Sequence, residues 1–222
     1  METPTSPTPL PDRLREGLAR IAAVMRSDDW RRAQELGVNP TQLAVLQCLE
    51  GRRDGMRVGD IASVLGVSQP TATDSIATLV AKQLVEKRID SGDGRSVRVF
   101  LTPTGQAATQ APSATPGAAE AVLQALPGDD QEQMLDLLVD LIRRLQERGA
   151  IPIQRMCASC RHFRPCAHAD AARPHHCAFV DAAFGQQDLR IECRDHEAAD
   201  PATRTAIWAA FDRDRPPILQ AP

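Results

Sequence analysis

Cysteine and histidine are concentrated in one stretch of this 222-residue chain, residues 153–198, which holds five of the six cysteines and all five histidines. Cys157 and Cys160 form a C-x2-C pair, a spacing that lets two thiolates hold one metal centre from a single turn. Cys177 follows after sixteen residues and Cys193 after fifteen more. We expect the chain to be cytosolic, where disulfides are rare, so this clustering predicts a metal or cluster site.

Two ligand sets fit the spacing. A structural zinc ion would use Cys157, Cys160, Cys193 and His196, of which the last two form a C-x2-H pair. An iron–sulfur cluster is held by thiolates and would use Cys157, Cys160, Cys177 and Cys193. This second spacing resembles that of high-potential iron–sulfur proteins and related small cluster-binding subunits. We favour a [4Fe–4S] cluster, with Zn2+ as the alternative, because the zinc set leaves Cys177 without a role.

The rest of this stretch offers little else that could bind or fold independently. Cys166 falls outside both ligand sets. Three histidines are expected to be solvated loop residues: His162, His168 and His175. The apolar pieces 178–180 and 189–191 are short. We therefore expect the metal to supply the folding free energy of this module.

A different chemistry is indicated by residues 58–84, which predict a short helix, a tight turn and a second helix. Gly66 ends the first helix, since glycine readily adopts the left-handed conformation of a helix end. Ser68 can cap the second helix and could also meet a phosphate. The expected buried stripe of this helix is Ile76, Leu79 and Val80. Its other face carries short polar side chains that can bond to base edges, namely Gln69, Thr71, Thr73 and Asp74.

The next residues predict a β-hairpin. Alternating apolar residues in 85–89 and 97–101 flank the turn sequence Ser91-Gly92-Asp93-Gly94. A hairpin with basic residues at its tip and flanks can reach phosphates or the minor groove beside a recognition helix. The candidate contacts are Lys87, Arg88, Arg95 and Arg98, of which Arg95 is expected to enter the minor groove, oriented by Asp93.

The helix-turn-helix followed by KRIDSGDGRSVRVFLTPTG resembles the MarR family of multiple-antibiotic-resistance-type regulators. The wing of that family carries an acidic residue, a short gap, an arginine and an apolar strand ending in Leu-Thr. Asp90, Asp93, Arg95, Leu101 and Thr102 match this pattern. The resemblance covers roughly residues 10–148. It implies a homodimer that binds double-stranded DNA, interlocks through its first and last helices, and could respond to a small-molecule or redox effector.

The predicted fold class is α+β, mainly α: a winged helix-turn-helix dimer with a helical dimerisation region and a small metal-stabilised C-terminal module. We expect a disordered N-terminus over 1–11 and the MarR-like domain over 12–148. The cysteine-rich module then spans 153–198, and a tail spans 199–222. Within the MarR-like domain, the leucine-rich helix 129–148 is the candidate dimer seam.

Composition narrows the function classes. The net charge of −3 means that any contact with nucleic acid must come from a local basic patch. The aromatic content of 3% argues against a stacking platform for single strands. The sequence predicts no membrane span, no signal peptide and no catalytic motif, so we expect a cytoplasmic protein that is not an enzyme.

These observations predict a sequence-specific transcriptional regulator of the MarR type that responds to redox state or metal through its cysteine cluster. The alternative is a redox or electron-transfer protein that uses the winged helix as a protein-interaction scaffold. The wing arginines count against this alternative, because electron transfer has no use for a basic hairpin tip.

Overall fold

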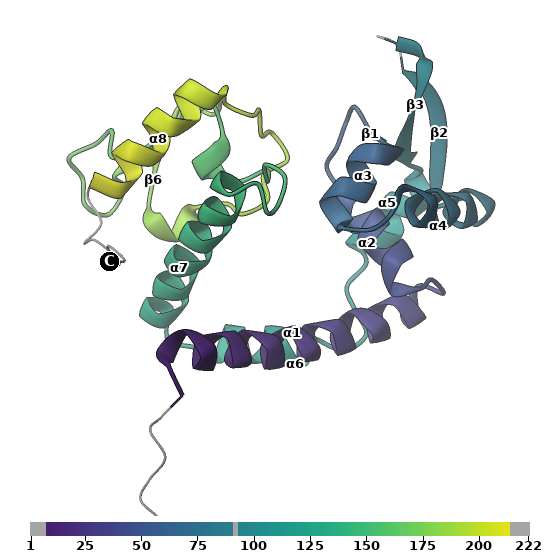
Figure 1. Ribbon diagram of the computed structural model, residues 1–222, viewed down its shortest axis with the longest axis horizontal. Coiled ribbons are helices and arrows are strands. Elements are labelled where there is room, and N and C mark those ends of the chain that lie inside the picture. The colour runs from purple at the N-terminus through teal and green to yellow at the C-terminus, as the bar shows by residue number, and fades with distance from the viewer. Residues whose placement is uncertain (1–7, 91–92, 214–222) are drawn as a thin grey trace, which may run out of the picture. The chain divides into compact units, whose positions relative to one another are not determined.

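The computed structural model describes residues 8–90 and 93–213. The chain divides into two compact units, Met1–Leu126 and Pro127–Pro222 (Figure 1). Residues 1–7 of the segment that we predicted to be disordered lie outside the described residues, whereas Leu10 and Pro11 already belong to the first helix.

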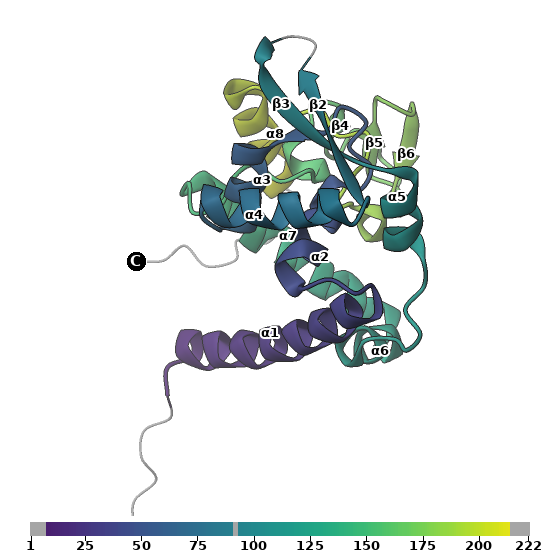
Figure 2. The same ribbon diagram turned by 90° about the vertical axis from the view of Figure 1, so that its right-hand side faces the viewer.

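The first unit combines helices with a small antiparallel sheet. Its elements are α1 (Leu10–Glu35), α2 (Pro40–Leu49), β1 (Met56–Arg57), α3 (Val58–Leu65), α4 (Gln69–Ala81), β2 (Val85–Asp90), β3 (Asp93–Leu101), α5 (Pro103–Gln110) and α6 (Ala118–Ala125). The strand order is β1-β3-β2, and Val99 on β3 lies opposite both Met56 and Lys87. The outer part of the β2–β3 hairpin extends past α3 and α4 (Figure 2), as expected for a wing.

One hydrophobic core holds α2, α3, α4 and the sheet together. On α4, Ile76 and Leu79 are fully buried, as predicted. Val80 is 38% exposed, so its predicted burial is wrong. The buried stripe runs instead through Ala72, Ile76 and Leu79, because these positions lie nearly in line on a 3.6-residue helix. The opposite face of α4 is therefore free of core contacts.

Local capping explains where the helices begin and end. Asn39 and Gln42 form a capping box at the start of α2, with N–H···O distances of 2.8 and 3.1 Å. Gly66 ends α3 in the left-handed conformation, with φ of 64°. Ser68 caps α4 and Thr102 caps α5, and each side chain accepts a hydrogen bond from the backbone N–H three residues later in the sequence.

Helix α6 packs alongside α1. The Asp28 carboxylate accepts a hydrogen bond from the backbone N–H of Ala119 at 3.1 Å, and this contact to the start of α6 lowers the pKa of Asp28. Another face of α1 carries exposed apolar side chains along its whole length: Leu10, Leu14, Leu18, Ile21, Val24, Met25 and Trp30.

The second unit contains α7 (Gly128–Glu147), the 3₁₀ turn η1 (Cys157–Ser159), β4 (Phe163–Arg164), β5 (His175–Cys177), β6 (Ala182–Phe184), the 3₁₀ turn η2 (Gln186–Asp188) and α8 (Pro201–Arg213). The three short strands form an antiparallel sheet in the order β4-β5-β6. No described helix in either unit has both the length and the apolar character needed to cross a membrane.

The core of the second unit is larger than the sequence suggested. It joins Val139 of α7, Met156 and Phe163 of the cysteine-rich stretch, and Trp208 and Phe211 of α8. The indole N–H of Trp208 also donates to the carbonyl oxygen of Ala158 at 2.7 Å. The cysteine-rich stretch thus packs against α7, which precedes it in the sequence, and against α8, which follows it. These contacts contribute folding free energy besides that of any bound metal.

The predicted place of the leucine-rich helix also differs from the structure. We expected 129–148 to close the MarR-like domain, but α7 packs within the second unit. The tail 199–222 likewise contributes α8 to the core of that unit. Short-range helical periodicity predicts that a helix has an apolar face, but it does not identify the partner of that face.

Candidate nucleic-acid interface and cysteine-lined cavity

The first candidate site is the exposed face of α4. At its start, the Ser68 hydroxyl oxygen accepts the Thr71 N–H at 3.3 Å and lies 2.8 Å from the Thr71 hydroxyl. Gln69, Thr71 and Asp74 are exposed. The first turn of α4 therefore presents a hydroxyl pair and an amide, groups that can both donate to and accept from base edges.

Two threonines on this helix use their hydroxyl hydrogens internally. The Thr73 hydroxyl donates to the carbonyl oxygen of Gln69 at 2.8 Å, and the Thr78 hydroxyl donates to that of Asp74 at 3.0 Å. Both side chains are exposed. Thr73 can consequently offer a methyl group and an oxygen lone pair to a partner, which suits contact with a thymine methyl.

The wing is the second part of this site. Lys87 is exposed on β2. Arg88 pairs with Glu86 and stacks over the Phe100 ring, with its guanidinium carbon 4.6 Å from the ring centroid. Arg98 donates to the carbonyl oxygens of Asp54 and Gly55 at 3.2 and 3.4 Å, which ties β3 to the loop before β1.

Two residues of the predicted wing motif, Asp93 and Arg95, lie in β3, but their side chains are outside the described residues. The minor-groove role of Arg95 therefore stays a prediction. The phosphate roles of Lys87, Arg88 and Arg98 also stay predictions, with Arg98 having a structural partner in the described fold.

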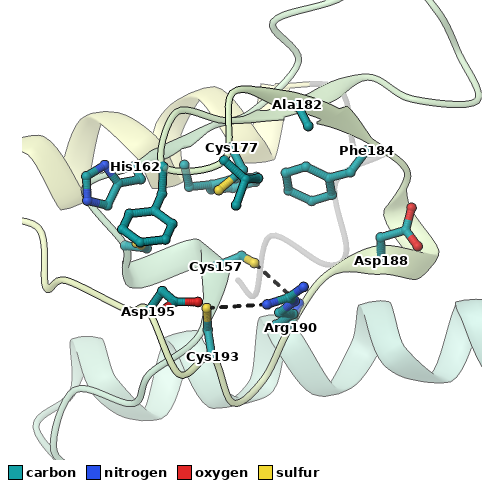
Figure 3. A pocket seen from close by; sticks show the side chains of 13 residues that line it. Cys157, His162, Cys177, Ala182, Phe184, Asp188, Arg190, Cys193 and Asp195 are labelled. Carbon is teal, nitrogen blue, oxygen red and sulfur yellow. Dashed lines mark hydrogen bonds between the residues drawn. The ribbon is translucent and has the colours of Figure 1, made fainter. Parts of the chain in front are cut away.

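The second candidate site is a cavity of about 260 Å³ in the second unit, and all four cysteines of the favoured ligand set line it. Figure 3 shows Cys157, Cys177 and Cys193 around this space, with Arg190 linked to Cys157 and Cys193. Cys160 belongs to the same lining. Much of the remaining wall is apolar: Phe163, Phe179, Val180, Ala182 and Phe184.

Backbone hydrogen bonds bring these cysteines together from separate segments. Cys157 begins η1, and its N–H donates to the carbonyl oxygen of Arg190 at 2.9 Å. Cys160 follows η1 directly, while Cys177 ends β5 opposite Phe163 of β4. The Cys193 N–H donates to the carbonyl oxygen of Arg155 at 2.7 Å. The fold therefore unites residues that are far apart in sequence.

Arg190 places two hydrogen-bond donors at these sulfurs. Its backbone N–H donates to Cys157 Sγ at 3.3 Å, and its Nη1 donates to Cys193 Sγ at 3.9 Å. Burial, together with the neighbouring cysteines, raises the pKa of the Cys157 thiol to about 11, although the hydrogen bond from the Arg190 N–H acts in the opposite direction. A free Cys157 is thus a protonated thiol at neutral pH, unlike a reactive redox cysteine, whose pKa is lowered.

His196, the alternative ligand, does not line the cavity. Its Nε2 lies 3.0 Å from the Ser159 hydroxyl oxygen. Cys166 also lies outside the lining, and its N–H donates to His175 Nδ1 at 3.2 Å. Among the described residues, no three His, Cys, Asp or Glu side chains are grouped so that they could share one metal ion.

The histidine expectations were partly wrong. His175 is buried at 2% exposure, where its Nε2 lies 2.6 Å from Gln186 Oε1. Its burial follows from its packing among the rings of Phe163, Phe184 and Phe211. His162 lines the cavity at its edge, whereas His168 is exposed. The sequence reasoning also missed Arg190, although a cation three residues before Cys193 was a usable signal.

Residues 38–97 match the MarR family. YsmB of Bacillus subtilis (strain 168), an HTH-type transcriptional regulator, is 29% identical over 93 residues, covering 42% of this chain and 63% of YsmB. The chain thus spans less than two thirds of the length of that curated relative.

Solved structures are also similar. A MarR transcriptional regulator from Methanosarcina mazei Go1 has a TM-score of 0.52 at 18% identity, covering 61% of this chain and 98% of that one. The S. aureus MepR–DNA complex has a TM-score of 0.49 at 23% identity, and the match covers 58% of this chain and 95% of the MepR chain. Residues 38–97 are thus similar to the MarR family, and the likeness to the Methanosarcina protein shows that the first unit has a winged helix-turn-helix fold.

Proposed function

We propose that this protein is a sequence-specific DNA-binding transcriptional regulator of the MarR type. The observation that carries the proposal is the exposed, almost uncharged polar face of α4 on a MarR-family winged helix. Short hydroxyl and amide side chains suit base-edge recognition in the major groove, while a purely solvated helix face is usually rich in charge.

Each part of the interface has a separate task in this proposal. Gln69, Thr71, Thr73 and Asp74 read or adjoin base edges, and Ser68 caps α4 near a phosphate. Lys87 and Arg95 contact the backbone from the wing. Arg88 and Arg98 have a second task, because Glu86, Phe100 and the loop before β1 hold their guanidinium groups in place.

We propose that the regulator is a homodimer, since two recognition helices match a two-fold operator. Support comes from the exposed apolar face of α1 and from the exposed stripe of α7, which comprises Met134, Leu137, Leu138, Leu141 and Leu145. Apolar faces of this length are expected to be covered in a stable soluble protein.

The cysteine-rich unit is the proposed sensor of redox state or metal. Three hydrogen bonds of the described residues link its loops to α7: the Gln186 amide donates to Asp136, the Gln146 amide donates to Met156 Sδ at 3.2 Å, and the Gln154 N–H donates to Gln146 Oε1 at 2.8 Å. Loosening the cavity would therefore loosen α7. If α7 belongs to the dimer seam, its release would change the spacing of the two recognition helices.

The test begins with an operator selected in vitro from random duplexes by the full-length protein. Gln69→Ala should reduce the preference for this operator over a scrambled duplex, because it removes a base-edge contact. Lys87→Ala should weaken binding to both duplexes by a similar factor and reduce the salt slope by about 1, since it removes a phosphate contact. Arg20→Ala, an exposed change on α1, is the matched charge control.

Failure to select any duplex, or equal binding by all three variants, would contradict the proposal. The electron-transfer alternative is not favoured, because the similarity of residues 38–97 to the MarR family points to a regulator. An electron-transfer protein would also have no use for the exposed polar face of α4.

A further inference from the structure

We infer that the cavity in the second unit binds a [4Fe–4S] cluster, with Cys157, Cys160, Cys177 and Cys193 each holding one iron. Cluster binding does not depend on DNA binding, whereas its use as a regulatory switch rests on the proposed function.

The arrangement of the thiols suits a cluster better than a single ion. Around one tetrahedral Zn2+, with Zn–S bonds of about 2.3 Å, four sulfurs lie roughly 3.8 Å from one another. The four cysteines here line a cavity of about 260 Å³ together with nine other residues, and no three of the described His, Cys, Asp or Glu side chains are grouped for a single ion. In a cluster each thiolate binds a different iron, so the sulfurs stand farther apart.

The surroundings of the cavity have the properties that a cluster needs. Buried Phe163 and half-buried Phe184 contribute apolar surface to the wall. The Arg190 backbone N–H and guanidinium point donors at Cys157 and Cys193. Hydrogen bonds to the ligand sulfurs and a nearby cation stabilise the negative charge of a thiolate-bound cluster.

The other possible ligands have different partners. His196 Nε2 lies against the Ser159 hydroxyl, and Cys166 contacts His175 through its N–H, so neither lines the cavity. The zinc set requires His196 to leave Ser159 and leaves Cys177 unused in the cavity wall. The thiolate set uses every cysteine of the lining and no residue from outside it.

Assembly of a [4Fe–4S]2+ core takes two ferrous ions, two ferric ions and four inorganic sulfide ions, so iron in both oxidation states balances the electrons without a further oxidant. Each of the four thiols releases its proton to water, and each sulfur donates an electron pair to one iron of the assembled core. No disulfide forms or breaks in this step, and the cysteine sulfurs are neither oxidised nor reduced.

The test uses full-length protein purified without oxygen, or reconstituted with ferrous and ferric iron and sulfide. The expected result is a brown protein with a broad visible absorption band. It should contain iron and sulfide in equal amounts, with one iron per cavity cysteine. Cys177→Ser should lose most of the absorption. Cys166→Ser is the matched control from the same stretch and should keep it.

If Cys177→Ser unfolds the unit, two further measurements still distinguish the cluster from a zinc site. Iron-edge X-ray absorption of the wild-type protein should show a sulfur-only ligand shell together with short iron–iron distances. A ligand shell containing nitrogen, or a colourless protein whose zinc is lost in His196→Ala, would overturn the inference. Failure to retain any metal after reconstitution would overturn it as well.

DNA binding of the same samples separates the two proposals. A brown protein without operator affinity would leave the cluster intact as a finding and reject the regulatory function. A metal-free protein that binds its operator would support the regulatory function and reject the cluster.

Discussion

His196 Nε2 lies 3.0 Å from the hydroxyl oxygen of Ser159, a side chain that is 0% exposed. The Ser159 hydroxyl has one hydrogen, and the carbonyl oxygen of Gln154 lies 2.6 Å away to accept it. The histidine Nε2 is then the donor to Ser159, so this nitrogen carries a hydrogen and is not available as a metal ligand.

This relationship predicts a structural phenotype for His196→Ala. The variant should retain iron and sulfide at the wild-type ratio but lose about 1–2 kcal/mol of unfolding free energy, because the buried Ser159 oxygen loses a donor. Metal analysis together with thermal unfolding measures both quantities. His168→Ala, an exposed histidine of the same unit, is the control. Loss of metal without loss of stability would show that His196 is a metal ligand and not a structural donor to Ser159.

Arg190→Gln should lower the reduction potential of the proposed cluster by an amount on the order of tens of millivolts, since it removes a cation and the hydrogen bond to Cys193. The backbone N–H bond to Cys157 remains, so the cluster should still assemble. A redox titration monitored by visible absorption measures the shift. Arg173→Gln, whose side chain pairs with Asp170, should leave the potential unchanged. Equal potentials in both variants would exclude a tuning role for Arg190.

Leu18→Glu should convert the proposed homodimer to monomers. Leu18 is 52% exposed on the apolar face of α1, and burying an unpaired carboxylate in a dimer seam costs several kcal/mol. Sedimentation velocity of the full-length protein measures the change. Arg20→Glu, at an exposed position about 200° round α1 from Leu18, should leave the proposed dimer intact. A Leu18→Glu protein that sediments as a dimer would move the seam away from this face.

Gly105→Ala should destabilise the first unit by roughly 2–4 kcal/mol. A Cβ at Gly105 would lie 2.0 Å from the carbonyl oxygen of Leu84, so α5 would have to move away from the turn between α4 and β2. Gly59→Ala is the matched control, because a Cβ there meets nothing within 4 Å, and alanine should be neutral or stabilising by up to about 1 kcal/mol. Denaturant unfolding compares the two. Equal stabilities would show that the turn between β3 and α5 yields easily.

Much of the first unit could be predicted from the sequence because its signals act over a few residues. Gly66 and Ser68 determine where α3 ends and α4 begins. The alternation around the glycine-rich turn is sufficient to predict the hairpin. Capping, turn geometry and periodicity are local interactions, so they can be recognised without knowing the rest of the fold. The predicted burial of Val80 was wrong because the apolar stripe of α4 is wider than the part of the helix that contacts the core.

The second unit was decided by tertiary structure. The sequence predicted a cysteine site but left His196 and Cys177 as competing members, since spacings of fifteen and sixteen residues do not determine which side chains meet. The short strands and the bonds between Cys157, Arg190, Arg155 and Cys193 place Cys177 in the cavity and leave His196 at Ser159. The partners of α7 and α8 were likewise unpredictable, because an apolar helix face gains nearly the same free energy from any apolar surface that fits it.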